Sequence, residues 1–297
     1  MNACADVLAL CAQHNETDPD RLIVRLCREL LDQCPTSAGP TPLKILGSLR
    51  GVRRYYSRPI HPATGCSGLL VPYDGGYEIT VHGGEPAERQ NFSIAHEVVH
   101  TYFREACPDC PASPEQERLC DVGAAELTMP STRFAATISK LGLTLASIDH
   151  VAAEFGVSFE AAARRAVILT EDPACMLAAT ISTGAAESPT PAELRIAKSW
   201  HSPAWRRERV DYRGLAIDPD SVIAQAFRHQ DERQARADIG IVACPGVHKV
   251  QARGYAYPLP GNPAHRQVVA IVSSITTASR HGRQELRPRL GCHRQAG

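Results

Sequence analysis

The chain has 297 residues, with 32 basic and 32 acidic side chains and a hydrophobic content of 43%. This length suffices for two or three compact units of roughly 100–150 residues each, and the composition is ordinary for a soluble globular protein. No segment has the ~20 uninterrupted apolar residues that a membrane helix needs. The first residues, Met1 to Asp6, lack the basic start of a secretory signal. We therefore expect a cytoplasmic protein that does not enter a membrane.

Charge is unevenly spread although it sums to zero. Residues 1–130 contain 11 basic and 17 acidic side chains, residues 131–192 contain 4 and 6, and residues 193–297 contain 17 and 9. A basic C-terminal third can face nucleic acid or an acidic partner, or it can be a solvated surface that offsets the acidic front half. Charge alone does not decide between these interpretations.

The predicted elements begin with two helices between residues 3 and 34, where apolar residues recur at helical spacing on either side of a break at Asn15 to Asp20. Residues 35–42 are rich in Pro, Gly, Ser and Thr and predict a loop. Next come three strand-like runs, the last two joined by a hairpin signal at Asp74 to Gly76: Val52–Tyr56, Gly68–Val71 and Tyr77–His82. We expect these runs to form a small antiparallel sheet.

Two longer helices are predicted to follow. The first runs from about Phe92 to Glu105 and has one apolar side. The second begins after a proline-rich loop, with Ser113 as its cap, Pro114 at the first helical position and Gln116 three residues after the cap. It ends near Met129, and residues 131–170 predict further short helices.

Beyond Pro173 the pattern changes to strands, at Met176–Ile181, Gly240–Cys244, Val250–Tyr257 and Gln267–Ser273. The sequence therefore predicts an α+β fold in three parts. These parts are residues 1–132 with the small sheet, a helical segment over residues 133–172, and a mixed α/β domain over residues 173–297.

His96 to His100 has the pattern HExxH. On a helix, residues four apart share a face, so both imidazoles can reach one ion, with nitrogens ~2.0–2.1 Å from zinc. Glu97 lies about 100° around the helix, beside the metal, where its carboxylate can take a proton from water that the metal binds. A surface helix with two histidines is the alternative. It is disfavoured because the apolar neighbours predict a largely buried helix, in which His and Glu need a partner.

A catalytic zinc site needs a third protein ligand and an open position. The extension HExxHxxGxxH is absent, and Glu105 points away from the ligand face. Glu117 and Asp121, on one face of the next helix, are better placed: Glu117 can complete the ligand set, and Asp121 can accept the free ring N–H of a ligand histidine. The alternative for Glu117 is a solvated helix charge.

These residues suit hydrolysis of a peptide bond. The metal polarises the scissile carbonyl, and Glu97 takes a proton and later passes one to the leaving amine. Tyr73, Tyr77 and His82 are candidates for a further donor that binds the substrate, by proximity in sequence alone. The strand that contains Tyr77 and His82 precedes the HExxH helix, and we expect that it can bind an extended peptide as an edge strand.

The eleven cysteines are odd in number and belong to a long chain without an export signal, which favours free thiols over a disulfide framework. Cys107 and Cys110 form a CxxC that can be a redox or metal element. No second CxxC exists to complete a structural zinc site. We favour a solvent loop that contains two cysteines by chance.

Two stretches resemble the signature of the ImmA/IrrE metallopeptidase family: Arg89 to His100 (RQNFSIAHEVVH) and Glu117 to Pro130 (ERLCDVGAAELTMP). The resemblance covers roughly residues 50–170. It implies a thermolysin-like zinc core with His96, His100 and Glu117 as ligands and a catalytic Glu97. It also implies a narrow protein substrate, a helix-turn-helix repressor of the XRE type, whose cleavage derepresses stress-response or mobile-element genes. Asp121 stands where the family often has Asn.

The layout also resembles the radiation-response branch of that family. It implies a peptidase at residues 1–132, a helix-turn-helix-like segment at residues 133–172 and a GAF-like sensor or regulatory domain at residues 173–297. The C-terminal residues show no motif that identifies them, so the sensor role follows from the layout.

A DNA-binding regulator is the main alternative, because Leu145 to Leu169 has helix-turn-helix form, with Gly156 ending one helix and Ser158 capping the next. Residues 136–170, however, carry three basic and three acidic side chains. Recognition helices lie in basic surroundings because phosphate contacts supply most of the affinity. A packing or protein-binding role fits this segment better. A third interpretation is a metal-sensing adaptor without turnover, and Glu97 argues against it because a purely structural site needs no additional carboxylate.

Overall fold

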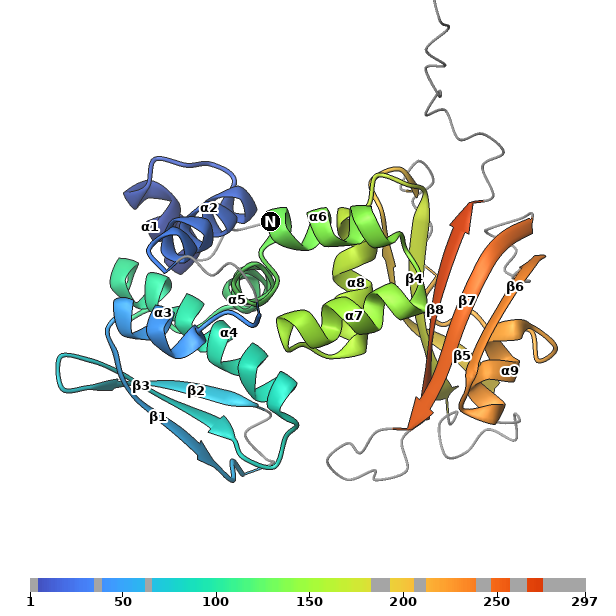
Figure 1. Cartoon of the computed structure of the whole chain (residues 1–297). Helices are drawn as coiled ribbons and strands as arrows, with labels where there is room; N and C mark the ends of the chain where they lie inside the picture. The colour runs from blue at the N-terminus through green and yellow to red at the C-terminus, as the bar shows by residue number, and fades with distance from the viewer. Residues whose placement is uncertain are drawn as a thin grey trace, which may run out of the picture.

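The computed structural model describes residues 5–34, 39–61, 66–182, 193–205, 212–238, 247–256 and 266–274. Figure 1 shows two lobes with helices α6 to α8 between them. The N-terminal lobe contains α1 to α5 and a three-stranded sheet, and the C-terminal lobe contains a five-stranded sheet with α9. The fold is therefore α+β, as the sequence predicts. No helix in the described ranges is long and apolar enough to cross a membrane.

The N-terminal lobe follows the predicted order of elements, with one addition. Its elements are α1 (Ala5–Gln13), α2 (Pro19–Asp32), α3 (Leu43–Leu49), β1 (Val52–Arg58), β2 (Gly68–Tyr73), β3 (Gly76–His82), α4 (Ala87–Ala106) and α5 (Pro114–Thr128). The seven-residue α3 was not predicted, because it is too short to show a helical period.

The small sheet has the order β1-β3-β2 and is mixed, so the prediction of an antiparallel sheet was wrong. β2 and β3 form the antiparallel hairpin, whereas β1 pairs with β3 in parallel, because the chain runs back along β2 before it enters β3. The central strand is therefore β3, with a neighbour on each side. The edge strand that faces α4 is β2, so the expectation that Tyr77 to His82 offers a free edge was also wrong.

Helices α4 and α5 pack closely on one another and contain the predicted site residues, from His96 to His100 on α4 and Glu117 and Asp121 on α5. The cap of α5 is as predicted: Ser113 Oγ accepts the backbone N–H of Gln116 at 3.1 Å. Gly123 of α5 allows the close approach, since a Cβ there would lie 2.7 Å from a methyl group of Val99 on α4. Both helices contribute to a core shared with α1, α2 and the small sheet.

The middle segment consists of α6 (Ser131–Leu141), α7 (Leu145–Phe155) and α8 (Phe159–Leu169). The predicted helix–turn–helix form is confirmed: Gly156 ends α7 in the left-handed conformation, and Ser158 Oγ accepts the N–H of Ala161 at 3.2 Å. Helix α8 does not stand free, because Ala162, Ala163 and Val167 are fully buried in a core that also includes side chains of β4 and β8.

The C-terminal sheet is antiparallel and has the order β5-β4-β8-β7-β6. Alternate residues of β4 enter different cores: Leu177 packs on the α9 side and Met176 on the α6–α8 side. The bounds are β4 (Ala174–Ser182), β5 (Glu193–His201), α9 (Val222–His229), β6 (Glu232–Asp238), β7 (Val247–Ala256) and β8 (Arg266–Ser274). The sheet is therefore covered by helices on both faces (Figure 1).

Three of these elements, β5, α9 and β6, were not predicted. β6 is an edge strand with the sequence ERQARAD, and such a polar strand lacks the alternating apolar pattern on which strand prediction depends. The strand expected at Gly240–Cys244 lies outside the described residues.

Candidate metal centre

His96 and His100 lie one turn apart on α4 and point their ring nitrogens at a common point. The two Nε2 atoms are 3.1 Å apart. His100 is buried and His96 is partly buried, so both imidazoles have lost much of their contact with water. This is the face that the HExxH spacing predicts.

Glu117 reaches the same point from the first turn of α5. Its Oε2 lies 3.1 Å from His96 Nε2, and its Oε1 lies 3.5 Å from His100 Nε2. The carboxylate is half exposed, so it borders solvent on the side away from the histidines. The structure therefore brings together the three residues that the sequence nominates as ligands.

The other ring nitrogen of each histidine is held by α5. His96 Nδ1 lies 3.0 Å from Asp121 Oδ1, the contact expected for Asp121. His100 Nδ1 lies 3.1 Å from the side-chain amide of Gln116, a residue that sequence analysis used only as a helix cap. The buried Gln116 Oε1 has no hydrogen-bond partner. Exchanging the amide's N and O positions would let this oxygen accept the Nδ1–H of His100.

These contacts allow a test of whether the residues fit zinc. Two ligand atoms that are each ~2.0–2.1 Å from a tetrahedral ion are roughly 3.3 Å apart. The three pairs among His96, His100 and Glu117 are separated by 3.1, 3.1 and 3.5 Å. A histidine that ligates through Nε2 donates its Nδ1–H to a neighbouring oxygen, and Asp121 and Gln116 can each supply one. The residues present fit the ion.

Cys120 is a second possible neighbour of the ion. Its Sγ and a ring nitrogen of each histidine lie within 4.8 Å of one another. The side chain is fully buried, and burial raises the pKa of its thiol well above the usual range, with nearby carboxylates adding to the effect. The Glu117 oxygens lie closer, at 3.1 and 3.5 Å from the two Nε2 atoms, so we favour Glu117 on geometry.

Electrostatics at the two histidines are consistent with a cation between them. Burial lowers the pKa of His100, and the charge of a protonated His96 lowers it further. Burial opposes protonation of His96 too, but the hydrogen bond to Asp121 and the charges of nearby carboxylates raise its pKa overall. The two rings are therefore not both imidazolium at once, and the nearby carboxylates favour positive charge at this point.

Glu97 lies beside the histidines and is only 6% exposed. Burial raises the pKa of its carboxyl to about 7, and the charge of Glu117 raises it as well. The backbone N–H of Leu70 on β2 donates to the carboxylate and, with His96 and Arg104, partly offsets this rise. Gly68 of β2 makes room for it, since a Cβ there would lie 2.7 Å from Glu97 Oε1. The edge strand thus forms part of the site, which the sequence did not indicate.

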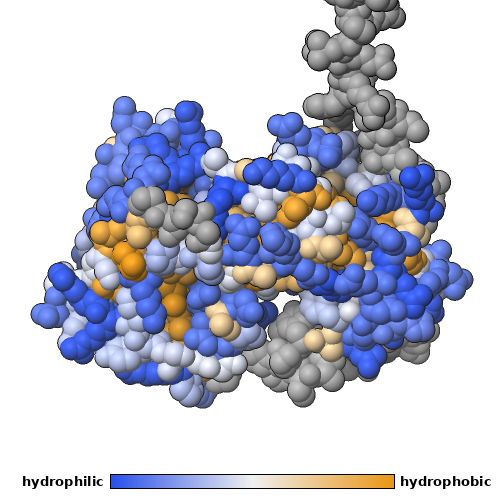
Figure 2. Space-filling view, in the orientation of Figure 1, coloured by the Kyte–Doolittle hydropathy of each residue, from blue (hydrophilic) through white to orange (hydrophobic). Residues whose placement is uncertain are grey.

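A cavity of about 620 Å³ opens from these residues. One wall contains the histidines, Glu97, Glu117 and residues of β2. The opposite wall comes from the start of α8 and from β5 and includes Arg164, Lys198 and Trp200. In Figure 2 a notch separates the two lobes at the lower edge of the view, and apolar side chains gather on the N-terminal lobe and over the middle helices. Sequence analysis did not find the second wall, because β5 was not predicted.

Tyr73, Tyr77 and His82 do not line the cavity. Tyr73 lies at the hairpin end of β2 under the guanidinium of Arg54. Tyr77 pairs with β1 and lies near Glu105, and His82 Nδ1 accepts the N–H of Gly84 at 3.0 Å in a local turn. The cavity instead offers the cationic donors Arg104, Arg164 and Lys198.

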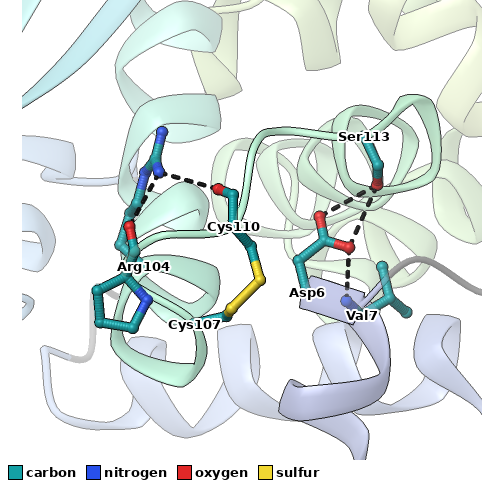
Figure 3. Close-up of a disulfide and its surroundings, with 7 residues drawn as sticks. Asp6, Val7, Arg104, Cys107, Cys110 and Ser113 are labelled. Carbon is teal, nitrogen blue, oxygen red and sulfur yellow. Dashed lines mark hydrogen bonds between the residues drawn. A yellow bond between two sulfur atoms is a disulfide. The ribbon is translucent and has the colours of Figure 1, made fainter.

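The interpretation of Cys107 and Cys110 as free thiols was wrong, because the two form a disulfide with their Cα atoms 5.4 Å apart (Figure 3). Sequence spacing allows either state, and it gave no signal for this one. Among the other described cysteines, Cys27, Cys120 and Cys175 are buried like small apolar residues, as predicted.

The convergence of two imidazoles and a carboxylate beside a buried glutamate is an arrangement typical of zinc peptidases. Residues 53–167 match a peptidase family model, described as the IrrE N-terminal-like domain. The match includes α4, α5 and the middle helices, and it agrees with the resemblance seen in the sequence.

A solved structure supports the fold over most of the chain. It is a Mycobacterium tuberculosis transcriptional regulator, with a TM-score of 0.55 and 14% identity over 91% of this chain and 92% of that one. At this identity the likeness concerns the fold alone. No curated protein matches the chain.

Proposed function

We propose that this chain is a zinc-dependent endopeptidase with His96, His100 and Glu117 as metal ligands and Glu97 as general base. The observation that carries the proposal is the convergence of two imidazoles and a carboxylate at 3.1–3.5 Å, with a second, buried carboxylate beside them. A purely structural metal site would leave the buried Glu97 without a purpose. The peptidase family of residues 53–167 supports the same conclusion.

Zinc in this ligand set would supply a Lewis acid that activates water and polarises a peptide carbonyl. The chain's own residues supply the rest. Glu97, with a pKa of about 7, can take a proton from water and return it to the leaving amine near neutral pH. Asp121 and Gln116 fix the ring orientations of His96 and His100. The N–H of Leu70 keeps the carboxylate of Glu97 in place.

We assign substrate binding to β2, in place of Tyr77 and His82. β2 pairs with β3 on one side only, and its other edge borders the cavity at Gly68 to Leu70. An extended peptide can add to this edge through main-chain hydrogen bonds, with its scissile bond beside Glu97. Leu69 is 38% exposed and offers apolar contact to a substrate side chain. The wall that contains Arg164 and Trp200 would face such a peptide from the other side.

The proposed substrate is a helix-turn-helix repressor of the XRE type, cut once to derepress its genes. A cleft closed on two sides suits one extended linker better than bulk protein. DNA binding by residues 136–170 is not part of the proposal, because α8 is buried against the sheet and Arg165 contacts Glu126. We retain the division into a thermolysin-like peptidase at residues 1–132, a helical segment at residues 133–172 and a GAF-like sensor domain at residues 173–297.

The test uses a helix-turn-helix repressor encoded beside the gene, incubated with the zinc-loaded chain. We expect a single cut that chelators abolish, with little activity on casein. Glu97→Gln should reduce cleavage by ~10²–10⁴-fold, because it removes the general base, and should keep its zinc. Fragments are identified by mass spectrometry.

Two outcomes would contradict the proposal. If Glu117→Ala kept full zinc while Cys120→Ser lost it, the third ligand would be the thiol. If Glu97→Gln relieved repression in cells as well as the parent chain and left the repressor intact, the protein would act by binding. That second result would favour the regulator interpretation, in which the metal site is not catalytic.

A further inference from the structure

The loop between α4 and α5 contains a disulfide that the proposed peptidase chemistry does not use. Cys107 follows the last residue of α4 and Cys110 lies three residues later, so the bond closes a very small ring. The same loop leads to Ser113, which caps α5. It therefore joins the helix that carries His96 and His100 to the helix that carries Glu117.

The ring is tied to the end of α4 by hydrogen bonds, and Ser113 further along the same loop caps α5. The N–H of Cys107 donates to Phe103 O at 2.8 Å, and Arg104 Nη1 donates to Cys110 O at 3.2 Å. Figure 3 shows Arg104 directed at the ring and, on the other side, Ser113 directed at Asp6 of α1. The Ser113 Oγ donates to Asp6 Oδ2 at 3.1 Å.

From Ser113 a short path leads to the metal centre. Ser113 Oγ accepts the N–H of Gln116, and the Gln116 side chain holds His100 Nδ1. Glu117, the proposed third ligand, is the next residue. Arg104 extends the connection from the other helix, because it lines the cavity as well as holding the ring. The loop conformation therefore influences where Gln116 and Glu117 lie relative to the histidines.

The disulfide is accessible to solution reductants. Cys107 and Cys110 are partly exposed, whereas Cys27, Cys120 and Cys175 are buried. Accessible disulfides exchange readily with thiolates, and those that close small rings restrain little of the unfolded chain. This bond therefore contributes little to global stability and can act locally.

We propose that Cys107–Cys110 is a thiol–disulfide exchange site whose oxidation state sets how tightly the metal centre holds zinc. The reactant is a dithiol, either a small molecule or a protein. Its thiolate attacks one sulfur and forms a mixed disulfide, and the displaced cysteine thiolate takes a proton. The second thiol of the reductant then attacks the mixed disulfide. The oxidised reductant is released with a disulfide of its own, cyclic in a small molecule or within a protein, and the second cysteine of the chain becomes a thiol. Two electrons and two protons move to the chain.

The direction of the effect follows from the tether. In the oxidised chain the ring fixes the end of α4 and the start of the loop. The loop then holds the first turn of α5 in a defined position relative to α4. Reduction frees this connection, so Gln116 and Glu117 become less well fixed and zinc is held less tightly. The loss should not exceed about thirty-fold, because a ring this small limits little chain entropy. The predicted effect of the disulfide on zinc retention rests on the proposed zinc site.

The exchange step is tested first, without reference to metal or activity. The full chain is equilibrated in buffers of reduced and oxidised dithiothreitol, quenched in acid and alkylated, and the modified cysteines are identified by mass spectrometry. We expect Cys107 and Cys110 to become alkylated together along one two-electron titration, before any buried cysteine. Alkylation of the pair only under denaturing conditions, or in fully oxidised buffer, would overturn the proposal.

The metal step is tested by zinc competition with a chelator after the dithiol has been removed under anaerobic conditions. Oxidised parent should retain zinc several-fold to about thirty-fold more tightly than reduced parent. The Cys107→Ser/Cys110→Ser variant should match reduced parent in both conditions. Cys34→Ser, which removes a free thiol after α2, is the control and should respond as the parent does.

Equal zinc retention in the oxidised and reduced parent would refute redox control and leave the metal centre intact. A chain that holds no zinc in either state would refute the metal centre and its redox control together. The alkylation titration separates these cases, because it reports the exchange site whether or not zinc binds.

Discussion

Two glutamates of the N-terminal lobe are almost equally buried and have opposite electrostatic surroundings. Glu97 on α4 is 6% exposed, and Glu126 on α5 is 2% exposed. Burial alone should raise the pKa of both carboxyls. Burial does raise the pKa of Glu97 to about 7. For Glu126 burial acts in the same direction, but the charge of Arg165 and hydrogen bonds from Ser131, Arg165 and Arg28 outweigh it and lower the pKa.

The difference lies in the cations supplied by other elements. Arg28 of α2 donates to Glu126 Oε1 at 3.1 Å, and Arg165 of α8 donates to Oε2. Through Arg165, Glu126 connects α5 to α8 of the middle segment. Arg165 strengthens this connection by donating to the carbonyl of Met129 as well. Glu97 has the Leu70 amide and the imidazoles, and it borders a cavity. A buried carboxylate with two arginines holds the fold, and one without such partners is available for chemistry.

The largest expected effect that tests this comparison is on stability. Glu126→Gln keeps the shape of the side chain but leaves Arg28 and Arg165 without a carboxylate, and it should lower the free energy of unfolding by about 3 kcal/mol. Glu97→Gln should leave it unchanged or raise it, because a buried charge is removed. Urea unfolding followed by circular dichroism gives both values.

A matched control for this prediction is Glu29→Gln. Glu29 is exposed and pairs with Arg25 on the same helix at 3.1 Å, so its loss should cost less than ~1 kcal/mol. If Glu126→Gln were as stable as this control, the buried network would not hold α8 to α5, and the contrast with Glu97 would fail.

The sequence predicted which side chains of α4 and α5 converge better than it predicted the fold around them, and the reason is physical. His96, His100, Glu117 and Asp121 lie on two successive helices, so spacing within each helix determines which side chains share a face. Gln116 was assigned only to the start of α5. A Gln at that position can belong to a helix cap, but its side-chain amide can also contact a histidine, as it does at His100. The partners of Glu126 lie 98 and 39 residues away, and no local pattern reports such contacts.

The edge strand shows the same limit. The sequence predicted both strands of the hairpin, but only the parallel pairing of β1 with β3 decides that β2 is the free edge. The polar edge strand β6 lacks an alternating apolar pattern, and α3 and α9, with seven and eight residues, are each only about two helical turns long. The second wall of the cavity depends on β5, which packs on β4 through long-range pairing.

A smaller effect is expected from the strand that adjoins Glu97. In Gly68→Ala the new Cβ would lie 2.7 Å from Glu97 Oε1, so the carboxylate must move away from its place beside the histidines. A shift of this kind should lower kcat/KM by about tenfold to a hundredfold. Zinc content and unfolding should change little, because the distance concerns a side-chain tip. Val71→Ala, exposed on the same strand, serves as control, and equal activity of the two variants would show that Gly68 does not position Glu97.

The smallest effect is a pH dependence of stability with opposite sign at the two glutamates, measured on the zinc-free chain between pH 3 and 8 against each Gln variant. The folded pKa of Glu126 is below its ordinary value of 4.5, so its contribution is fully present above about pH 4.5 and is lost as the pH falls through the folded pKa. The difference in unfolding free energy between the parent and Glu126→Gln should therefore become smaller in acid.

The folded pKa of Glu97 is raised from 4.5 to about 7, so between these pH values the folded chain binds a proton that the unfolded chain has lost. Relative to Glu97→Gln, the parent should lose stability as the pH rises from about 4.5 to 7, and then no further. If the two gaps changed in the same direction with pH, cation pairing would not be what separates these carboxylates, and the assignment of one to structure and the other to chemistry would lose its physical basis.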